Sequence, residues 1–150
     1  LEMAQPGDVI VVDAGGDPNT SVCGGLMGGL AQNRGIRGMI VDGAGRDTDE
    51  LEDIGWPIWT RAITPRGTHT MFSGRKEELS VNVPIACGGV VVNPGDFIVA
   101  DLMGVVVIPL AHAEEVVRLA AEQAEREEKT RAWVRQGKTV EDLLAEFGRI

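Results

Sequence analysis

The segment Gly38-Met39-Ile40-Val41-Asp42-Gly43-Ala44-Gly45-Arg46-Asp47 decides the fold that we expect for this chain. Its apolar start predicts a buried strand, and the glycines that follow predict a turn. In open α/β sheets, ligands bind where strands end in such turns. Arg46 offers a fork of donors for a carboxylate, and Asp47 offers an oxygen ligand for a divalent cation. The alternative interpretation is an exposed turn with an ordinary ion pair.

Two earlier segments complete a parallel crossover with this strand. Residues 9–13 form an apolar strand after the turn Pro6-Gly7-Asp8, and residues 23–33 are compatible with a helix. Leu26, Leu30 and Ala31 form the apolar stripe that we expect this helix to bury. Strand, helix and strand in this order are typical of a parallel crossover. The turn and its strand recur at residues 94–101, which indicates two similar strand entries in one sheet system.

The rest of the chain is rich in strands and then becomes helical. We expect a short helix at 49–52, a strand at 57–62, a polar loop at 64–78, and strands at 81–85, 90–92, 97–100 and 105–108. Residues 112–136 have helical periodicity, and Thr139 with Asp142 resembles a capping box for a last helix that Gly148 closes. These features predict an α/β core over residues 1–110 and a helical C-terminal arm over residues 111–150. We expect this arm to pack on its own domain or on a neighbouring subunit. Residues 1–7 read like the last turn of a helix with its stop signal, so we expect an N-terminal helical segment to be absent.

The composition excludes several classes of partner and of location. With 150 residues, 43% of them hydrophobic, the chain is long enough for one domain with a core. A formal charge of −9 argues against binding to nucleic acid or to an anionic membrane. The sequence has neither an apolar run of membrane-spanning length nor a signal peptide pattern. Cys23 and Cys87 indicate buried thiols in a reducing, cytoplasmic compartment, although a single disulfide stays open as an alternative.

The glycine-dense segment Gly24-Gly25-Leu26-Met27 is the second candidate for chemistry. At the start of a helix, its backbone N–H groups could bind an anion without any side chain. Glycines that serve close packing are an equally good interpretation of this segment. One crossover brings the start of this helix and the end of the next strand to the same sheet edge. We therefore expect the Gly24–Met27 amides, Arg46 and Asp47 to converge on one pocket.

Other reactive side chains are weaker candidates. His69 and His112 lack a second ligand at metal spacing, so we expect structural or solvent-exposed roles for both. Ser21 has no evident base, and none of the three lysines, Lys76, Lys129 and Lys138, has the apolar surroundings that Schiff-base chemistry needs. The acidic residues around Asp47 are expected to form mostly a solvated face that could support cation binding; they are Asp42, Asp49, Glu50, Glu52 and Asp53.

Several motifs, in order, resemble the RraA-like family. They include Pro-Gly-Asp-Val-Ile-Val-Val-Asp (6–13), Gly-Gly-Leu-Met (24–27), Val-Asp-Gly-Ala-Gly-Arg-Asp (41–47), Thr-Pro-Arg-Gly (64–67) and Val-Pro-Ile-Ala-Cys-Gly-Gly-Val (83–90). Two further motifs are Pro-Gly-Asp-Phe-Ile-Val-Ala-Asp (94–101) and Gly-Val-Val-Val-Ile-Pro (104–109). The family contains the divalent-metal 4-hydroxy-4-methyl-2-oxoglutarate / 4-carboxy-4-hydroxy-2-oxoadipate aldolases and the regulator of ribonuclease activity A. The resemblance implies a swivelling β/β/α fold related to phosphohistidine domains, usually assembled as a homotrimer.

The resemblance also implies roles for the candidate residues. It puts a pyruvate-like substrate on the backbone of Gly24, Gly25, Leu26 and Met27 and on Arg46, and it makes Asp47 the ligand of Mg²⁺ or Mn²⁺. The implied function is a metal-dependent lyase on pyruvate-derived 2-oxo acids, by retro-aldol cleavage or oxaloacetate decarboxylation. The alternatives are a non-catalytic protein that regulates a partner such as a ribonuclease, and a metal-dependent enzyme for another substrate.

One position departs from the aldolase pattern. The aldolases have an acidic residue, then twenty positions, then Arg-Asp, and counting back from Arg46 leads to Gly25. Without that acid, we expect metal and pyruvate binding to survive while aldol cleavage weakens.

Overall fold

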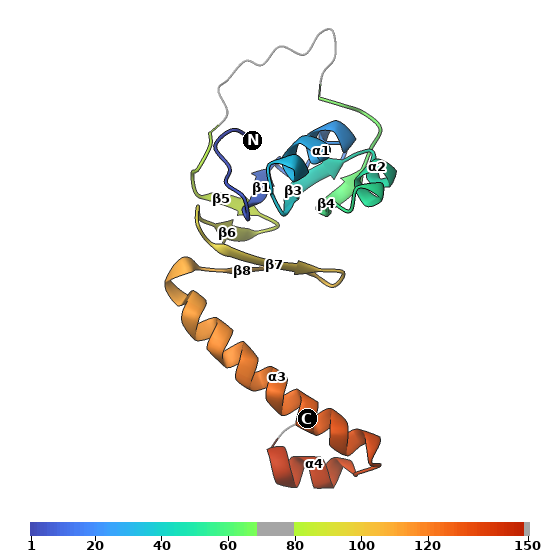
Figure 1. Ribbon diagram of the computed structural model, residues 1–150, viewed down its shortest axis with the longest axis vertical. Coiled ribbons are helices and arrows are strands. Elements are labelled where there is room, and N and C mark those ends of the chain that lie inside the picture. The colour runs from blue at the N-terminus through green and yellow to red at the C-terminus, as the bar shows by residue number, and fades with distance from the viewer. Residues whose placement is uncertain (69–79, 149–150) are drawn as a thin grey trace. The chain divides into compact units, whose positions relative to one another are not determined.

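The computed structural model describes residues 1–68 and 80–148 of the chain (Figure 1). It divides into two compact units, Leu1–Pro109 and Leu110–Ile150. The first unit holds the strands and two short helices, and the second holds the long C-terminal helix and the helix after it.

A parallel sheet of four strands organises the first unit. Its strands are β1 (Val9–Asp13), β2 (Ser21–Cys23), β3 (Gly38–Gly45) and β4 (Ile58–Ile63). β3 pairs in parallel with all three others, with Val9 opposite Gly38, Ser21 opposite Ala44 and Met39 opposite Ile58. The predicted parallel crossover is confirmed, and β3 is a fully buried strand. β2 was not expected, because three residues are too short for a clear hydrophobic pattern.

Two helices cover one face of this sheet and form the core with it. α1 (Gly25–Asn33) and α2 (Thr48–Asp53) pack with Met39 and Val41 of β3 around Ala31, Leu51 and Trp56. The predicted apolar stripe of α1 is wrong for Leu26 and Leu30, which are 83% and 56% exposed, and right for Ala31, which is buried. Beside Ala31, the helix buries Gly25 and Gly28 in place of the two leucines. Small residues let α1 approach α2 closely, so the contact depends on shape rather than on large apolar side chains.

Two antiparallel hairpins follow the parallel sheet. β5 (Ile85–Cys87) pairs with β6 (Val90–Val92), and β7 (Phe97–Asp101) pairs with β8 (Gly104–Ile108). The strand expected at 81–85 is wrong over residues 81–84. Asn82 has a left-handed backbone (φ 54°), and Pro84 has no N–H to donate to a ladder.

The repeated turn is real, but its two copies do not enter one sheet system. Gly7 and Gly95 have φ values of 99° and 91°. Asp8 accepts a bond from the Gln5 N–H at 2.8 Å, and Asp96 accepts one from the Asn93 N–H at 2.9 Å. β1 then joins the parallel sheet, whereas β7 turns back onto β8. The turn sets how each strand starts, and the segment that follows decides its partner.

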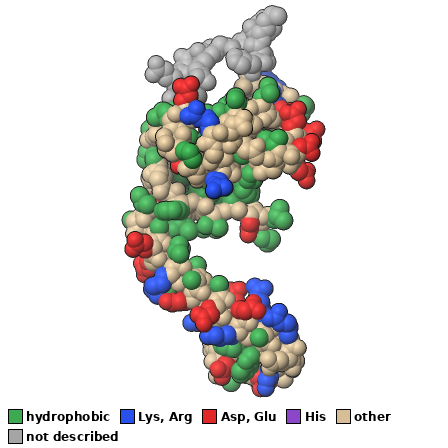
Figure 2. Space-filling view, in the orientation of Figure 1, with side chains coloured by type: hydrophobic (Ala, Val, Ile, Leu, Met, Phe, Trp, Pro, Cys, Tyr) green, Lys and Arg blue, Asp and Glu red, His purple; other side chains and the backbone are tan. Residues whose placement is uncertain are grey.

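The second unit begins with a 3-10 turn (Leu110–His112) and continues as α3 (Ala113–Arg135) and α4 (Val140–Phe147). The predicted capping box of Thr139 and Asp142 is confirmed, and Gly148 ends α4 in the left-handed conformation. Trp133 of α3 meets Phe147 of α4 edge to face at 5.3 Å. Figure 2 shows acidic and basic side chains interspersed along these helices. Several of them form ion pairs four residues apart, such as Arg118–Glu122. Along residues 1–68 and 80–148, we find no helix with both the length and the apolar character to cross a bilayer.

Candidate functional site

The candidate site lies at the carboxyl edge of the parallel sheet, where β2 and β3 end. β2 leads directly into α1, and β3 leads through Arg46 and Asp47 into α2. The Arg46 N–H donates to the Cys23 carbonyl at 3.0 Å, so the ends of the two strands are tied together. The crossover thus places the start of α1 beside the residues that follow β3.

Asp47 has an unusual conformation and an unusual partner. It precedes α2 with a left-handed backbone (φ 51°, ψ 45°), and its side chain makes no capping bond to α2. An aspartate at this position normally caps its own helix, which contributes about 0.5–2 kcal/mol. Here its Oδ2 accepts bonds from the Gly25 N–H and from Arg46 Nε, both at 3.2 Å. Its Oδ1 accepts no hydrogen bond from any described residue. The carboxylate is therefore aimed at the start of α1, with one oxygen available to a ligand.

Two glycines confine the side chain of Arg46. A Cβ on Gly24 would lie 2.7 Å from Arg46 Nε and 2.8 Å from its Cγ, and a Cβ on Gly67 would collide with Nη1. Gly67 is held nearby because its neighbour Arg66 accepts a bond from the Ser21 N–H at 2.8 Å. Among the described residues, only Nε of the guanidinium has a hydrogen-bond partner. Nη1 and Nη2 remain as a fork for a carboxylate. Gly67 was not a predicted site residue, although the motif at 64–67 contains it.

The first turn of α1 offers backbone donors. Leu26 is largely exposed and Met27 is 42% exposed, so neither side chain closes a pocket. Their N–H groups stand in the first turn, where no helical carbonyl can reach them, and they have no acceptor among the described residues. The predicted site residues Gly24, Gly25, Arg46 and Asp47 are thus in mutual contact, and Leu26 and Met27 add amides beside them.

Glu50, one of the acidic residues expected on a mostly solvated face that could support cation binding, is exposed and also lies next to Gly25. A Cβ on Gly25 would lie 2.8 Å from Glu50 Cδ and closer still to Glu50 Oε2. The position has no side chain of its own, but a carboxylate from α2 occupies that space.

Asp42 does not belong to the solvated acidic face, which corrects that prediction. It is 9% exposed, forms an ion pair with Arg61, and accepts a bond from the Gly88 N–H at 2.8 Å. The hydrogen bond from Arg61, followed by that from Gly88, holds the pKa of Asp42 below its ordinary value. Asp42 and Cys87 also line a cavity of about 410 Å³ whose lining does not include Asp47.

Both cysteines are free thiols rather than a disulfide. Cys23 is buried at the end of β2, and Cys87 is half-buried. Burial raises the pKa of each thiol, so neither is an activated nucleophile.

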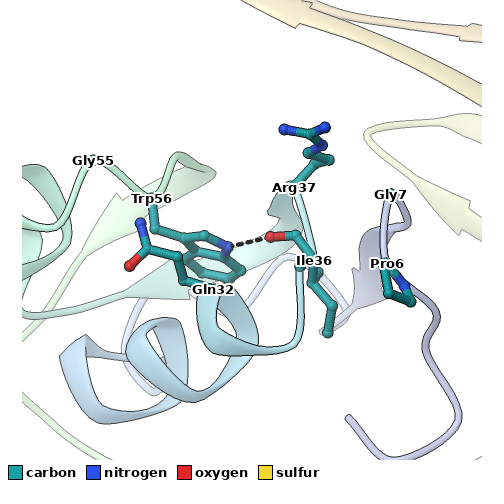
Figure 3. A pocket seen from close by; sticks show the side chains of 8 residues that line it. Pro6, Gly7, Gln32, Ile36, Arg37, Gly55 and Trp56 are labelled. Carbon is teal, nitrogen blue, oxygen red and sulfur yellow. Dashed lines mark hydrogen bonds between the residues drawn. The ribbon is translucent and has the colours of Figure 1, made fainter.

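A cavity of about 450 Å³ lies at the other edge of the sheet. Figure 3 shows Trp56 and Gln32 on one side of it and Pro6 on the other, with Trp56 Nε1 donating to the Ile36 carbonyl at 2.8 Å. Its residues precede β1, β3 and β4. Ligands of parallel sheets bind at the carboxyl ends of the strands, so this cavity is a poor candidate for the active site.

The residues at the carboxyl edge fit Mg²⁺ or Mn²⁺ better than a metal that needs a full protein cage. Residues 1–68 and 80–148 contain no group of three or more His, Cys, Asp or Glu side chains that could enclose a cation. Mg²⁺ commonly keeps several waters and takes one or two carboxylates. Asp47 with its available oxygen satisfies that requirement. His69 and Lys76 lie outside the described residues, and His112 stands before α3 in the other unit.

Comparison with known proteins identifies the family. The family model described as "RraA-like: Aldolase/RraA" matches residues 1–107. The chain belongs to the RraA-like family. A Halalkalibacterium halodurans protein named "Putative 4-hydroxy-4-methyl-2-oxoglutarate aldolase" is 42% identical over 130 residues, which are 86% of this chain and 60% of that protein. The chain thus spans about three fifths of the length of this relative.

Solved structures support the same RraA-like fold. A protein of Pseudomonas syringae matches with a TM-score of 0.85 and 29% identity, over 95% of this chain and 69% of that one. Streptomyces coelicolor RraAS2, described as an unusual member of the RNase ES inhibitor RraA protein family, matches with a TM-score of 0.77 and 36% identity. That match covers 87% of this chain and 65% of RraAS2. The predicted α/β RraA-like fold with C-terminal helices is confirmed.

Proposed function

We propose that this chain is a divalent-metal-dependent lyase that acts on pyruvate-derived 2-oxo acids. The observation that carries the proposal is the direction of Asp47, whose carboxylate leaves its own helix uncapped and bonds the first amide of α1. The aldolase names of relatives such as the Halalkalibacterium halodurans protein support the same class of reaction.

Each part of the site has a role in this chemistry. Arg46, confined by Gly24 and Gly67, holds the substrate carboxylate through Nη1 and Nη2. The Leu26 and Met27 amides add donors at the positive end of α1. Asp47 would hold Mg²⁺ or Mn²⁺. Such a cation, when bound, would supply positive charge next to the 2-keto oxygen as an enolate of pyruvate develops.

The test is release of pyruvate from oxaloacetate and from 4-hydroxy-4-methyl-2-oxoglutarate with added Mg²⁺ or Mn²⁺. Oxaloacetate should give pyruvate and CO₂, with a proton added at the carbon that loses the carboxyl group. Asp47→Ala is expected to lower kcat/KM by at least about 100-fold, a typical loss when a charge-stabilising group is removed. Asp53→Asn, on the exposed end of α2, is the matched control because it removes one charge without contact with the site. Metal-dependent rates no higher than those of the metal alone in buffer would contradict the proposal.

A second candidate is a non-catalytic regulator of a ribonuclease. The description of Streptomyces coelicolor RraAS2 suggests it, and the β7–β8 hairpin exposes Phe97, Leu102 and Met103 for a protein contact. Slower RNA cleavage by RNase ES with this chain added, unchanged by Arg46→Ala, would favour it. The homotrimer that the family resemblance implies stays a prediction that light scattering can test.

A further inference from the structure

Glu50 is an acidic residue whose place at the candidate site cannot be deduced from its position in the chain. It stands in the first turn of α2, where acidic residues suit the helix dipole, and so does its neighbour Asp49. Asp49 and Glu50 differ in the contacts of their side chains. The Glu50 side chain crosses to the start of α1 and fills the space over Gly25, as a Cβ there would lie 2.8 Å from its Cδ and 2.9 Å from its Cβ.

The same glycine also contacts Asp47. Its N–H donates to Asp47 Oδ2 at 3.2 Å, while the Glu50 carboxylate lies where its side chain would begin. The Glu50 carboxylate accepts no hydrogen bond from any described residue. Gly25 therefore borders two carboxylates, those of Asp47 and Glu50, and Arg46 forms an ion pair only with the carboxylate of Asp47. A cation with its waters, which are strong hydrogen-bond donors to carboxylates, would compensate the second negative charge beside Gly25.

The approach of Glu50 depends on the packing of α1 against α2. Buried Leu51, the residue after Glu50, contacts Gly28 of α1. Gly25 is likewise buried and leaves the space that Glu50 occupies. The packing of α1 against α2 in the core therefore sets the position of Glu50, which differs from the positions of Asp49, Glu52 and Asp53.

We propose that Glu50 is the second carboxylate of this site, a positioning residue that holds water ligands of the divalent cation bound by Asp47. This inference rests on the proposed function, because it takes Asp47 as the direct ligand. Carboxylates that orient the ligands of a metal typically change its affinity 10–100-fold when they are replaced.

The experiment measures Mn²⁺ binding to the full chain by calorimetry and by electron paramagnetic resonance, without substrate. Glu50→Gln keeps the shape and removes the charge, and it is expected to weaken Mn²⁺ binding by about tenfold. Glu52→Gln is the matched control, since it removes the same charge from the same helix without contact with Gly25. We expect it to change the affinity by less than about twofold, because a side chain without contact to Gly25 acts on the cation only as a screened, more distant charge.

The possible outcomes separate this inference from the proposed function. Asp47→Asn should abolish Mn²⁺ binding, and persistence of binding in that variant would contradict the proposed function itself. If Asp47→Asn abolishes binding but Glu50→Gln behaves like Glu52→Gln, the role of Glu50 is wrong while the proposed function stands.

A transplant of the carboxylate gives a second test. Glu50→Gly should bind Mn²⁺ weakly, and adding Gly25→Asp should restore most of the affinity, because removing the whole Glu50 side chain, including the Cβ that would lie 2.9 Å from a Cβ at position 25, makes room for the new carboxylate. No recovery in a double variant that unfolds at the wild-type temperature would overturn the inference.

Discussion

Gly28→Ala tests whether α1 and α2 pack as closely as the site requires. A Cβ on Gly28 would collide with Cδ2 of Leu51 and lie 3.0 Å from Cε3 of Trp56. Leu51 and Trp56 are each only 2% exposed, so neither can move aside into solvent. Overpacking of a filled core costs about 1–3 kcal/mol. Alanine in place of glycine inside a helix contributes roughly 1 kcal/mol in the opposite direction.

Gly29→Ala is the matched control, because its added Cβ meets nothing within 4 Å. It occupies the next position of the same helix, so the gain in helix propensity is the same and cancels in the comparison. Gly29→Ala should therefore be more stable than Gly28→Ala by about 1–3 kcal/mol in urea unfolding followed by circular dichroism. For a chain of this length, 2 kcal/mol corresponds to roughly 4–8 °C in Tm.

The same two variants also test whether the packing of α1 on α2 affects metal binding. Because Leu51 and Glu50 are neighbours, a displaced α2 should weaken Mn²⁺ binding in Gly28→Ala and leave it unchanged in Gly29→Ala. Equal stability of the two variants would refute the close packing of α1 on α2, and with it the geometry argued for Glu50.

Three further predictions concern other parts of the chain. Arg46→Lys replaces a planar fork by a point charge and should raise KM for oxaloacetate by about 10–100-fold in steady-state assays, whereas an unchanged KM would argue against a carboxylate at Arg46. The hydrogen bond from Arg61 holds the pKa of Asp42 in the folded protein below its ordinary value. The Asp42–Arg61 ion pair therefore stabilises the fold at pH values above the ordinary pKa, and this stabilisation is lost as the pH falls through the folded pKa. Asp42→Asn should lower the urea midpoint at pH 7 and flatten its decline below about pH 4, and a decline as steep as in the wild type would count against this account. Thr139→Ala removes the capping box of α4 and should cost about 0.5–2 kcal/mol, seen as faster hydrogen exchange of the α4 amides; exchange at the wild-type rate would mean that the cap is dispensable.

The local signals in the sequence were sufficient for most of the fold. Continuous apolar runs predicted β1 and β3, and a capping box with a closing glycine predicted α4. The prediction failed where a local rule met a tertiary contact. Leu26 and Leu30 have the spacing of a buried stripe, but Gly28 against Leu51 turns the other face of α1 inward. Residues 81–84 have strand-like composition, but the left-handed Asn82 and the missing N–H of Pro84 end the pairing.

For the site, the sequence by itself determined that Arg46 and Asp47 follow a buried strand and that a glycine-dense helix start precedes it. A parallel crossover must bring these two segments to one edge, because the chain can return to the sheet in only one way. Only the tertiary structure decided the side-chain partners: Asp47 bonds Gly25 instead of capping α2, Gly67 confines Arg46, and Asp42 faces Arg61. The tertiary structure also decided that the carboxylate of Glu50 occupies the space next to Gly25, which has no side chain of its own. Such contacts depend on the distance between packed helices, which is set by the side chains of several separate segments at once and leaves no pattern along the chain.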